Sequence, residues 1–286
     1  MNVFKIQWNI GNECNFDCAY CPPSLKEGLT PRPNDESFDL ALKNISVQTN
    51  QYDLVDIELT GGEPTLYGCV RQCLSKNTGK LKFSFHSNST ADLDWWASSV
   101  GNLSEITLSL HHQIDFEHFA KVVDLLKDHC RLKVLVAMPV DCFEQQQARY
   151  SLIKGKCEIK PQMLYTNFTK GNNEYQSYTD EHWTWYFSET GVNPKSSFDI
   201  SNTIEFKRIN KTNEYLGHLC WAGHSQIIID PYGWAFRGWC KANTALGNVY
   251  EGSLVLDRKP RVCPKSLCTN GFDLQAKKSE DTWGFS

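Results

Sequence analysis

The amino-acid sequence predicts an α/β protein whose strands form a parallel sheet or an incomplete barrel. Six short strand-like runs alternate with helix-like segments from residue 3 to about 164, which implies parallel pairing through right-handed crossovers. Apolar and polar residues alternate within these runs, so one face packs on helices. The other face is polar and lines a ligand cavity, unlike the apolar interior of a closed eightfold barrel. After about residue 216 a small cysteine-bearing module replaces this pattern.

Each predicted element follows from its local pattern. The expected strands are 3–8, 55–60, 81–87, 105–111, 132–138 and 157–163. The clearest helix is 115–130, where Asp115 is the expected N-cap and apolar residues recur at helical spacing. Residues 165–215 are rich in aromatic side chains and form either a packed connection or an aromatic wall over the cavity. The last module has turn signals at 230–233 and 246–248, and its small size predicts that it needs a metal.

Composition excludes several classes of protein. The formal net charge is −4; residues 1–204 carry 18 Lys and Arg against 25 Asp and Glu, and residues 205–286 carry 11 against 8. This balance argues against a nucleic-acid partner, although the basic C-terminal part leaves room for a phosphorylated or nucleotide-like substrate. No apolar run approaches the roughly 20 residues of a membrane span, and the N-terminus does not resemble a signal peptide. We therefore expect a cytoplasmic protein without a membrane partner.

The chain contains 12 cysteines, which need an explanation. In a reducing cytosol, clustered cysteines bind metal or carry out redox chemistry more often than they form disulfides. Two groups are evident, and the remaining cysteines are interpreted as small buried hydrophobic residues on helices or strands: Cys69, Cys73, Cys130, Cys142 and Cys157.

The first group, Cys14, Cys18 and Cys21, has the spacing C-x3-C-x2-C directly after the first strand. Three thiolates can bind three irons of a cubane cluster and leave the fourth iron open for a substrate or cofactor. The alternatives are a zinc knuckle that lacks its fourth ligand, or a chance spacing. The nearest downstream histidine, His86, is too far along the chain for a zinc finger.

Together with the sequence 60-TGGEP-64 at the end of the second strand, this loop resembles the radical S-adenosylmethionine (SAM) superfamily over residues 3–165. The resemblance implies a partial (β/α)6 TIM-like barrel and a [4Fe-4S] cluster held by the three cysteines. In that family the open iron is chelated by the amino and carboxylate groups of SAM. An electron from the cluster then cleaves SAM to a 5′-deoxyadenosyl radical.

The resemblance also implies positions that contact SAM. Gly61, Gly62, Glu63 and Pro64 match the motif that contacts the methionyl amino group, and Tyr20 is expected near the adenine. Two polar residues on later strands are further candidates, Asn88 and Ser109. His111 stands where the family commonly has Asp, which puts a role for that position in doubt. The candidates for proton transfer to or from substrate are His86, His111 and His112, with a structural histidine as the alternative for each.

The second group, Cys220, Cys240, Cys263 and Cys268, resembles the twitch form of the SPASM auxiliary iron–sulfur domains. Four cysteines close one auxiliary [4Fe-4S] cluster, which serves as an electron acceptor or as structural support in that family. A zinc site with four cysteine ligands is the structural alternative. The expected organisation is a radical SAM partial barrel over 1–165, an aromatic-rich connection over 166–215 and a twitch- or SPASM-like domain over 216–286.

These features predict an enzyme that abstracts hydrogen from a small molecule such as a sugar, cyclitol or nucleotide, with flavodoxin or ferredoxin as electron donor. The alternatives are a maturase that modifies a ribosomally made peptide, and a non-catalytic iron–sulfur scaffold. Because Cys14 stands so near the start, we expect no N-terminal peptide-recognition domain, which favours the small molecule. The GGEP sequence and the polar cavity argue against a scaffold, which needs neither.

Overall fold

The computed structural model describes residues 1–21, 23–75, 79–166, 175–191, 214–242, 244–268 and 270–280. The chain forms two compact units. The terminal unit comprises Met1–Asn9, Pro33–Glu58 and Asn193–Ser286, and the central unit comprises Ile10–Arg32 and Leu59–Val192. Within the described residues, no helix is both long and apolar enough to cross a membrane.

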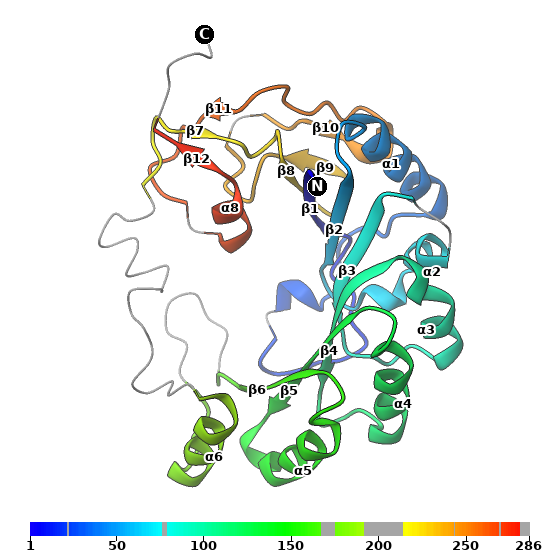
Figure 1. Ribbon diagram of the computed structural model, residues 1–286, viewed down its shortest axis with the longest axis vertical. Helices are drawn as coiled ribbons and strands as arrows, with labels where there is room; N and C mark the ends of the chain where they lie inside the picture. The colour runs from blue at the N-terminus through cyan, green and yellow to red at the C-terminus, as the bar shows by residue number, and fades with distance from the viewer. Residues whose placement is uncertain are drawn as a thin grey trace. The chain divides into compact units, whose positions relative to one another are not determined.

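The central unit contains four parallel strands in the order β3 (Leu81–Ser87), β4 (Leu103–Leu110), β5 (Arg131–Met138) and β6 (Glu158–Met163). Its helices are α2 (Gly68–Ser75), α3 (Leu93–Ser99), α4 (Phe116–Leu126), α5 (Phe143–Ile153) and α6 (Asp180–Thr190). Short 3-10 turns lie at Pro23–Leu25, Pro64–Leu66, Val100–Asn102 and Val140–Cys142. Figure 1 shows α2 to α5 following one another along one side of the strands. The parallel pairing predicted from the alternation of strands and helices is confirmed.

The alternating pattern of the strands is also confirmed. In β3, Leu81, Phe83 and Phe85 are buried, while Lys82 and Ser84 are partly exposed and His86 is exposed. Phe85 packs on the indole rings of Trp95 and Trp96 in α3. Asp92 is the N-cap of this helix, because its side chain accepts a hydrogen bond from the Trp95 backbone N–H. Helix α4 likewise begins after Asp115, as predicted, and ends at Leu126.

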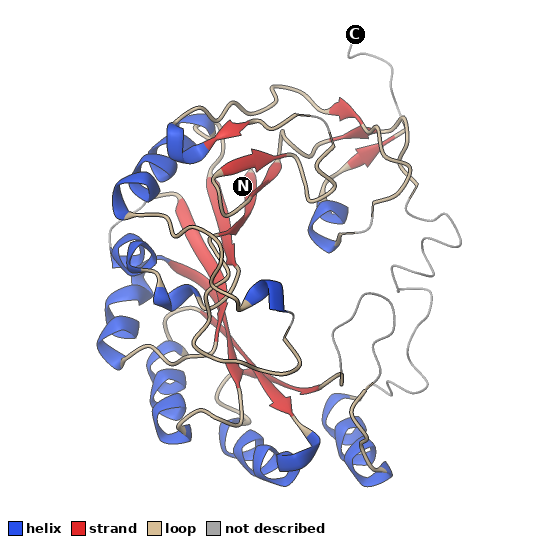
Figure 2. Ribbon diagram, turned by 180° about the vertical axis from the view of Figure 1, so that it is seen from behind, coloured by secondary structure: helices blue, strands red, loops and turns tan. Residues whose placement is uncertain are grey.

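The polar face of these strands lines a cavity of about 220 Å³. His86, Thr107 and Lys133 are among its lining residues, and the Lys133 ammonium forms an ion pair with Glu105 at 2.6 Å. The polar residues that the alternation places on one face of the strands thus line a charged cavity. Figure 2 shows the helices of this unit along the other side of its strands.

The terminal unit contains five neighbouring strands in the order β10 (Gly247–Asn248), β9 (Trp234–Phe236), β8 (Gln226–Ile229), β1 (Val3–Asn9) and β2 (Leu54–Thr60, whose last two residues belong to the central unit). Strand β8 pairs in parallel with β1 and antiparallel with β9 (Figure 1). Helix α1 (Asp35–Gln48) packs on β1, where the Trp8 and Phe38 rings stack at 4.7 Å.

A second, three-stranded sheet in the terminal unit has the order β11 (Arg261–Val262), β7 (Leu219–Cys220) and β12 (Lys278–Ser279). The remaining elements are α8 (Gly271–Gln275) and a 3-10 turn at Val249–Glu251. The turn predicted at 230–233 joins β8 to β9, and the Asp230 carboxylate accepts hydrogen bonds from the backbone of Tyr232 and Trp234. The cysteine-bearing region thus extends the sheet of β1, a pairing that sequence analysis did not anticipate.

Much of the aromatic stretch 165–215, including Phe168, lies outside the described residues. Its described part contains α6, which sequence analysis missed. Thr179 and His182 form a capping box at the start of α6, and Gly191 ends the helix in the left-handed conformation. Trp183 lies against Tyr175, with ring centroids 5.2 Å apart, so part of this stretch is a packed aromatic cluster.

Candidate functional site

The loop that carries Cys14, Cys18 and Cys21 lies in the central unit, immediately after Ile10. Cys18 is buried and the other two are half-buried, and the thiols lie close enough to influence one another electrostatically. Burial is the main cause that raises the pKa of all three thiols. Metal binding must therefore displace protons from them.

The three thiols of this loop are the type of donor that irons of an iron–sulfur cubane bind. In the described part of the chain, no three or more His, Cys, Asp or Glu side chains are grouped so that they could hold one metal ion. Each iron of a cubane binds its own thiolate, so the cysteine sulfurs stand farther apart than the donors around a single ion. Three thiols on one short loop are the donors that such a cluster requires.

The GGEP sequence is joined to the cysteine loop by a ladder of backbone hydrogen bonds. The Ile10 N–H donates to the Thr60 carbonyl at 3.0 Å, the Gly62 N–H to Gly11 at 3.1 Å and the Glu63 N–H to Glu13 at 2.8 Å. A Cβ atom on Gly62 would stand 2.0 Å from the Glu13 carbonyl oxygen. Glycine at this position therefore allows the two backbones to meet beside the first cysteine.

Glu63 is 2% exposed, and its carboxylate is surrounded by hydrogen-bond donors. Oε1 accepts from the Thr65 backbone N–H, the Thr65 hydroxyl and the Ser87 hydroxyl, and Oε2 accepts from the Asn88 N–H at 2.6 Å. Burial raises the pKa of Glu63, while these hydrogen bonds oppose that rise. The carboxylate thus ties the segment after β2 to the end of β3.

Asn88 links the end of β3 to the cysteine loop. Its side-chain amide donates to Asn15 Oδ1 at 2.7 Å and lies 4.0 Å from the Cys14 sulfur. Its Oδ1 accepts from the Thr90 hydroxyl at 2.7 Å. The structure therefore brings three predicted residues, Cys14, Glu63 and Asn88, into one hydrogen-bonded arrangement.

His111 lies against the same loop from the end of β4. Its Nδ1 is 2.5 Å from the Tyr20 hydroxyl and 3.7 Å from the Cys18 sulfur, and the Phe16 ring meets the imidazole edge-on. Burial, with a smaller contribution from His112, lowers the pKa of His111 to about 4, so the imidazole is neutral at pH 7. Burial is also the main cause that raises the pKa of Tyr20. Position 111, where the family pattern has Asp, therefore holds a neutral ring against the loop.

The other predicted residues lie at strand ends or on the polar face. Pro64 is buried and opens a 3-10 turn, and Gly61 has a φ of 132°. Ser109 is half-buried on β4 opposite Leu135. His112 Nδ1 is buried without a hydrogen-bond partner, whereas His86 is exposed and lines the 220 Å³ cavity.

The four C-terminal cysteines are brought together within the terminal unit. Cys220 is the last residue of β7. Burial is the main cause that raises the pKa of the Cys220 and Cys240 thiols, and the nearby Cys263 contributes to both shifts. Burial raises the pKa of the Cys268 thiol to about 11, and Cys220 and Cys240 make smaller contributions to this rise. Four thiols from separate segments thus lie within electrostatic reach of one another.

Asp273 is a residue of this site that sequence analysis missed. It is buried, and its two carboxylate oxygens each accept one backbone hydrogen bond at 2.9 Å, from Trp239 and from Cys240. Asp273 follows the Asn270 cap of α8, a local signal for a helix start but not for a contact 33 residues away. The carboxylate fixes the backbone that carries Cys240.

No protein-family model matches the chain. A probable GTP 3′,8-cyclase of Halobacterium salinarum is 29% identical over 96 residues, which cover 31% of this chain and 26% of that protein. A GTP 3′,8-cyclase of Haemophilus influenzae is 39% identical over 66 residues, or 22% of this chain and 18% of that protein. The chain thus spans about a quarter or less of the curated relatives it matches.

Two solved structures resemble the chain over most of its length. Streptococcus suis SuiB bound to the precursor peptide SuiA has a TM-score of 0.52 and 14% identity, covering 88% of this chain and 64% of SuiB. Native anSMEcpe with bound AdoMet has a TM-score of 0.50 and 17% identity, covering 87% of this chain and 78% of anSMEcpe. At these identities the likeness shows a shared α/β fold with a mostly parallel sheet.

Proposed function

We propose that this chain is a member of the radical SAM superfamily that reductively cleaves SAM and abstracts hydrogen from a small-molecule substrate. The main support for this proposal is the ladder of backbone hydrogen bonds between residues 10–13 and residues 60–63. Through this ladder the GGEP segment lies beside Cys14. When bound, the [4Fe-4S] cluster and SAM supply an electron and a 5′-deoxyadenosyl radical.

In this proposal Cys14, Cys18 and Cys21 would hold the cluster and leave one of its irons open for SAM. The Gly61–Pro64 segment contacts the methionyl part of SAM, since glycines allow a ligand to approach the backbone closely. The Asn88, Ser109 and Tyr20 side chains complete the SAM site, where Tyr20 packs near the adenine. The partial (β/α)6 barrel and the organisation 1–165, 166–215 and 216–286 belong to the same proposal.

We further propose that Cys220, Cys240, Cys263 and Cys268 hold an auxiliary [4Fe-4S] cluster in a twitch-like domain. The mutual influence of their thiols and the Asp273 carboxylate behind Cys240 support this assignment. An auxiliary cluster accepts an electron in a net oxidation or supports the pocket. Flavodoxin or ferredoxin is the proposed electron donor for the first cluster.

The proposed substrate is a small molecule such as a sugar, cyclitol or nucleotide. Two observations support it: the curated relatives bear the name GTP 3′,8-cyclase, and the polar face of the central unit lines a charged cavity. Among the candidate proton-transfer residues, His86 lines that cavity and is exposed. His111 and His112 remain candidates nearer to the cysteine loop.

The second candidate function is modification of a short ribosomally made peptide. It is favoured by the likeness to SuiB, which was solved with a bound precursor peptide. A peptide substrate predicts deuterium transfer into 5′-deoxyadenosine from a labelled peptide and not from labelled GTP or sugars. A non-catalytic scaffold predicts no SAM cleavage at all.

The deciding experiment is reductive cleavage of SAM by anaerobically reconstituted protein, with 5′-deoxyadenosine measured by mass spectrometry. We expect cleavage by the native protein and by Cys157→Ala, whose cysteine lies outside both cysteine groups, and background levels for Cys18→Ala. The Cys157→Ala variant controls for the loss of a thiol. Cleavage by Cys18→Ala, or none by the native protein, would refute the proposal.

A further inference from the structure

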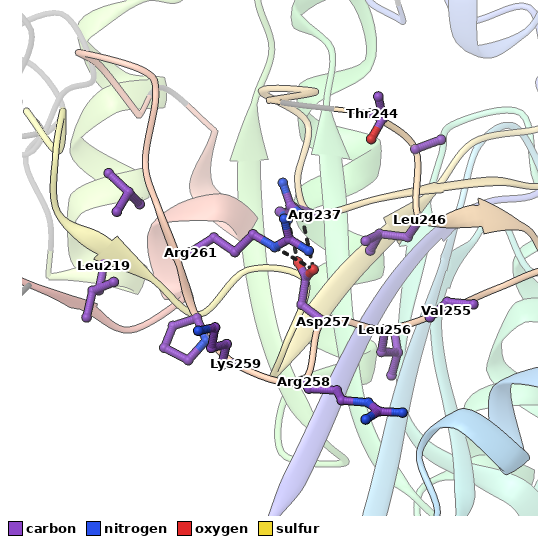
Figure 3. Close-up of a pocket in the computed structure, with 13 residues that line it drawn as sticks. Leu219, Arg237, Thr244, Leu246, Val255, Leu256, Asp257, Arg258, Lys259 and Arg261 are labelled. Carbon is purple, nitrogen blue, oxygen red and sulfur yellow. Dashed lines mark hydrogen bonds and ion pairs between the residues drawn. The ribbon is translucent and has the colours of Figure 1, made fainter. Parts of the chain in front are cut away.

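A cavity of about 950 Å³ lies wholly within the terminal unit (Figure 3). Its lining residues include four cationic side chains, Arg237, Arg258, Lys259 and Arg261, and one carboxylate, Asp257. The whole chain has a net charge of −4. Positive charge is therefore concentrated at this cavity although the protein is acidic overall.

Arg237 is the buried centre of this charge. The residue is 8% exposed, and its Nε and Nη2 donate to the two Asp257 oxygens at 2.5 and 3.1 Å. Its remaining nitrogen, Nη1, is buried and has no hydrogen-bond partner. A buried guanidinium donor without an acceptor is costly, and Arg237, which carries this donor, is one of the residues that line the cavity.

The Asp257 carboxylate does not neutralise the wall, because it serves two guanidinium groups. Arg261 Nε also donates to Asp257 Oδ1, at 2.8 Å, and Figure 3 shows both arginines converging on the carboxylate. Arg261 is 61% exposed, unlike Arg237. One guanidinium is thus fixed and buried, and the second can reach a ligand from the solvent side.

The backbone at Gly223 packs closely against the Arg237–Asp257 pair. A Cβ atom on Gly223 would stand 2.4 Å from Asp257 Oδ2 and 2.7 Å from Arg237 Cγ, and Gly223 has a φ of 92°. The Asp257 N–H donates to the Gly223 carbonyl at 3.0 Å. Any larger residue at position 223 would clash with the ion pair and would strain the backbone, so glycine is required there. This close packing holds the Arg237–Asp257 pair in one geometry.

We propose that this cavity binds the phosphate groups of a small phosphorylated molecule. Guanidinium groups bind phosphate oxygens through paired hydrogen bonds, and three arginines around one aspartate suit a polyanion better than a single carboxylate. The volume is that of a small-molecule site. A nucleic-acid polymer is disfavoured because the chain as a whole is acidic.

The test is isothermal titration of the reconstituted full chain with inorganic pyrophosphate, and with citrate as a carboxylate polyanion. We expect saturable pyrophosphate binding that Arg258→Gln/Arg261→Gln weakens at least tenfold. That double variant removes the Arg261–Asp257 hydrogen bond but keeps the buried Arg237–Asp257 pair, so we expect an unchanged circular dichroism spectrum. The matched control is Arg71→Gln, an exposed arginine on α2 that does not line the cavity, which should change the affinity less than twofold.

The proposal is overturned if the native protein shows no saturable binding, if citrate binds as tightly as pyrophosphate, or if Arg71→Gln weakens binding as much as the double variant. Arg237→Lys provides a second measurement, because it keeps the charge beside Asp257 but removes Nη1. We expect it to weaken pyrophosphate at least fivefold while circular dichroism remains unchanged. None of these outcomes depends on SAM cleavage, which is measured separately.

Discussion

The two groups of cysteines are assembled in different ways. Cys14, Cys18 and Cys21 come from a single loop of the central unit, which is held by backbone hydrogen bonds to residues 60–63. Cys220, Cys240, Cys263 and Cys268 come from separate segments of the terminal unit, where a buried carboxylate, Asp273, fixes the backbone at Cys240. The first group depends on local spacing, and the second depends on long-range folding.

The difference also concerns what each group leaves open. Three thiolates leave one iron of a cubane without a protein ligand, whereas four thiolates complete its coordination. In the proposed function the loop in the central unit is therefore the reactive site, and the four-cysteine group transfers electrons or supports structure. A substitution in one cysteine group, or in the contacts that support it, should therefore leave the other group unchanged as a reference.

The largest expected effect is loss of one whole cluster. Replacing Cys14, Cys18 and Cys21 by Ala should lower the iron content from about eight to about four per chain, because each cubane contains four irons. Replacing the four C-terminal cysteines by Ala should cause the same loss of iron. Only the first variant should lose reductive cleavage of SAM. The measurement is iron per chain after anaerobic reconstitution, together with 5′-deoxyadenosine formation.

A native iron content of about four that the triple variant abolishes would show that the C-terminal cysteines hold zinc or nothing, and the electron-acceptor role would fail. Equal loss of SAM cleavage in both variants would contradict the assignment of separate roles.

The second prediction concerns Glu63→Gln. The glutamine amide would place an N–H donor where Oε1 or Oε2 now accepts from a backbone N–H, of Thr65 or Asn88, which cannot accept a hydrogen bond in return. We expect the free energy of unfolding to fall by about 1.5–3 kcal/mol, the scale of a buried hydrogen bond to a charged group. The measurement is urea unfolding, with the exposed Glu117→Gln as control. A decrease as small as that of the control would refute the structural role of the carboxylate.

Much of the central unit could be predicted from the sequence because its signals are local. The alternation of polar and apolar residues located β3 and β5 to within one or two residues, and Asp115 marked the start of α4. The ladder between residues 10–13 and 60–63 could not be predicted from either motif alone, because it joins two loops that are distant in the sequence.

The terminal unit was less predictable because its contacts join distant residues. The parallel pairing of β8 with β1 connects positions more than 200 residues apart, and no periodicity encodes it. Asp273 and Arg237 are single charged residues in the sequence, and only the fold shows that one supports Cys240 and the other is buried beside Asp257. Helix α6 was missed because its apolar pattern is weak, although Thr179 and His182 are a recognisable cap.

The third prediction concerns Gly62→Ala. The new methyl group would overlap the Glu13 carbonyl oxygen, so the ladder must shift beside Cys14. We expect a loss of about 2 kcal/mol in the free energy of unfolding, the typical cost of overpacking, and reduced SAM cleavage. The control is Gly101→Ala, since a Cβ at Gly101 meets nothing within 4 Å. Equal behaviour of the two variants would contradict the close approach of the backbones.

The smallest expected effect is that of Asp273→Asn, which tests the other side of the comparison. Asp273 accepts two backbone hydrogen bonds, from Trp239 and Cys240, whereas Glu63 is surrounded by four donors. The side-chain amide introduced by this substitution would turn an N–H toward a backbone N–H, so we expect a loss of about 1–2 kcal/mol in the free energy of unfolding. Because the carboxylate fixes the backbone of Cys240 and all four thiols remain, we expect only a partial loss of iron from the auxiliary site, while SAM cleavage persists. The measurements are iron content and 5′-deoxyadenosine formation, with the exposed Asp128→Asn as control. Loss of SAM cleavage with full iron content would show that Asp273 acts on the reactive site instead.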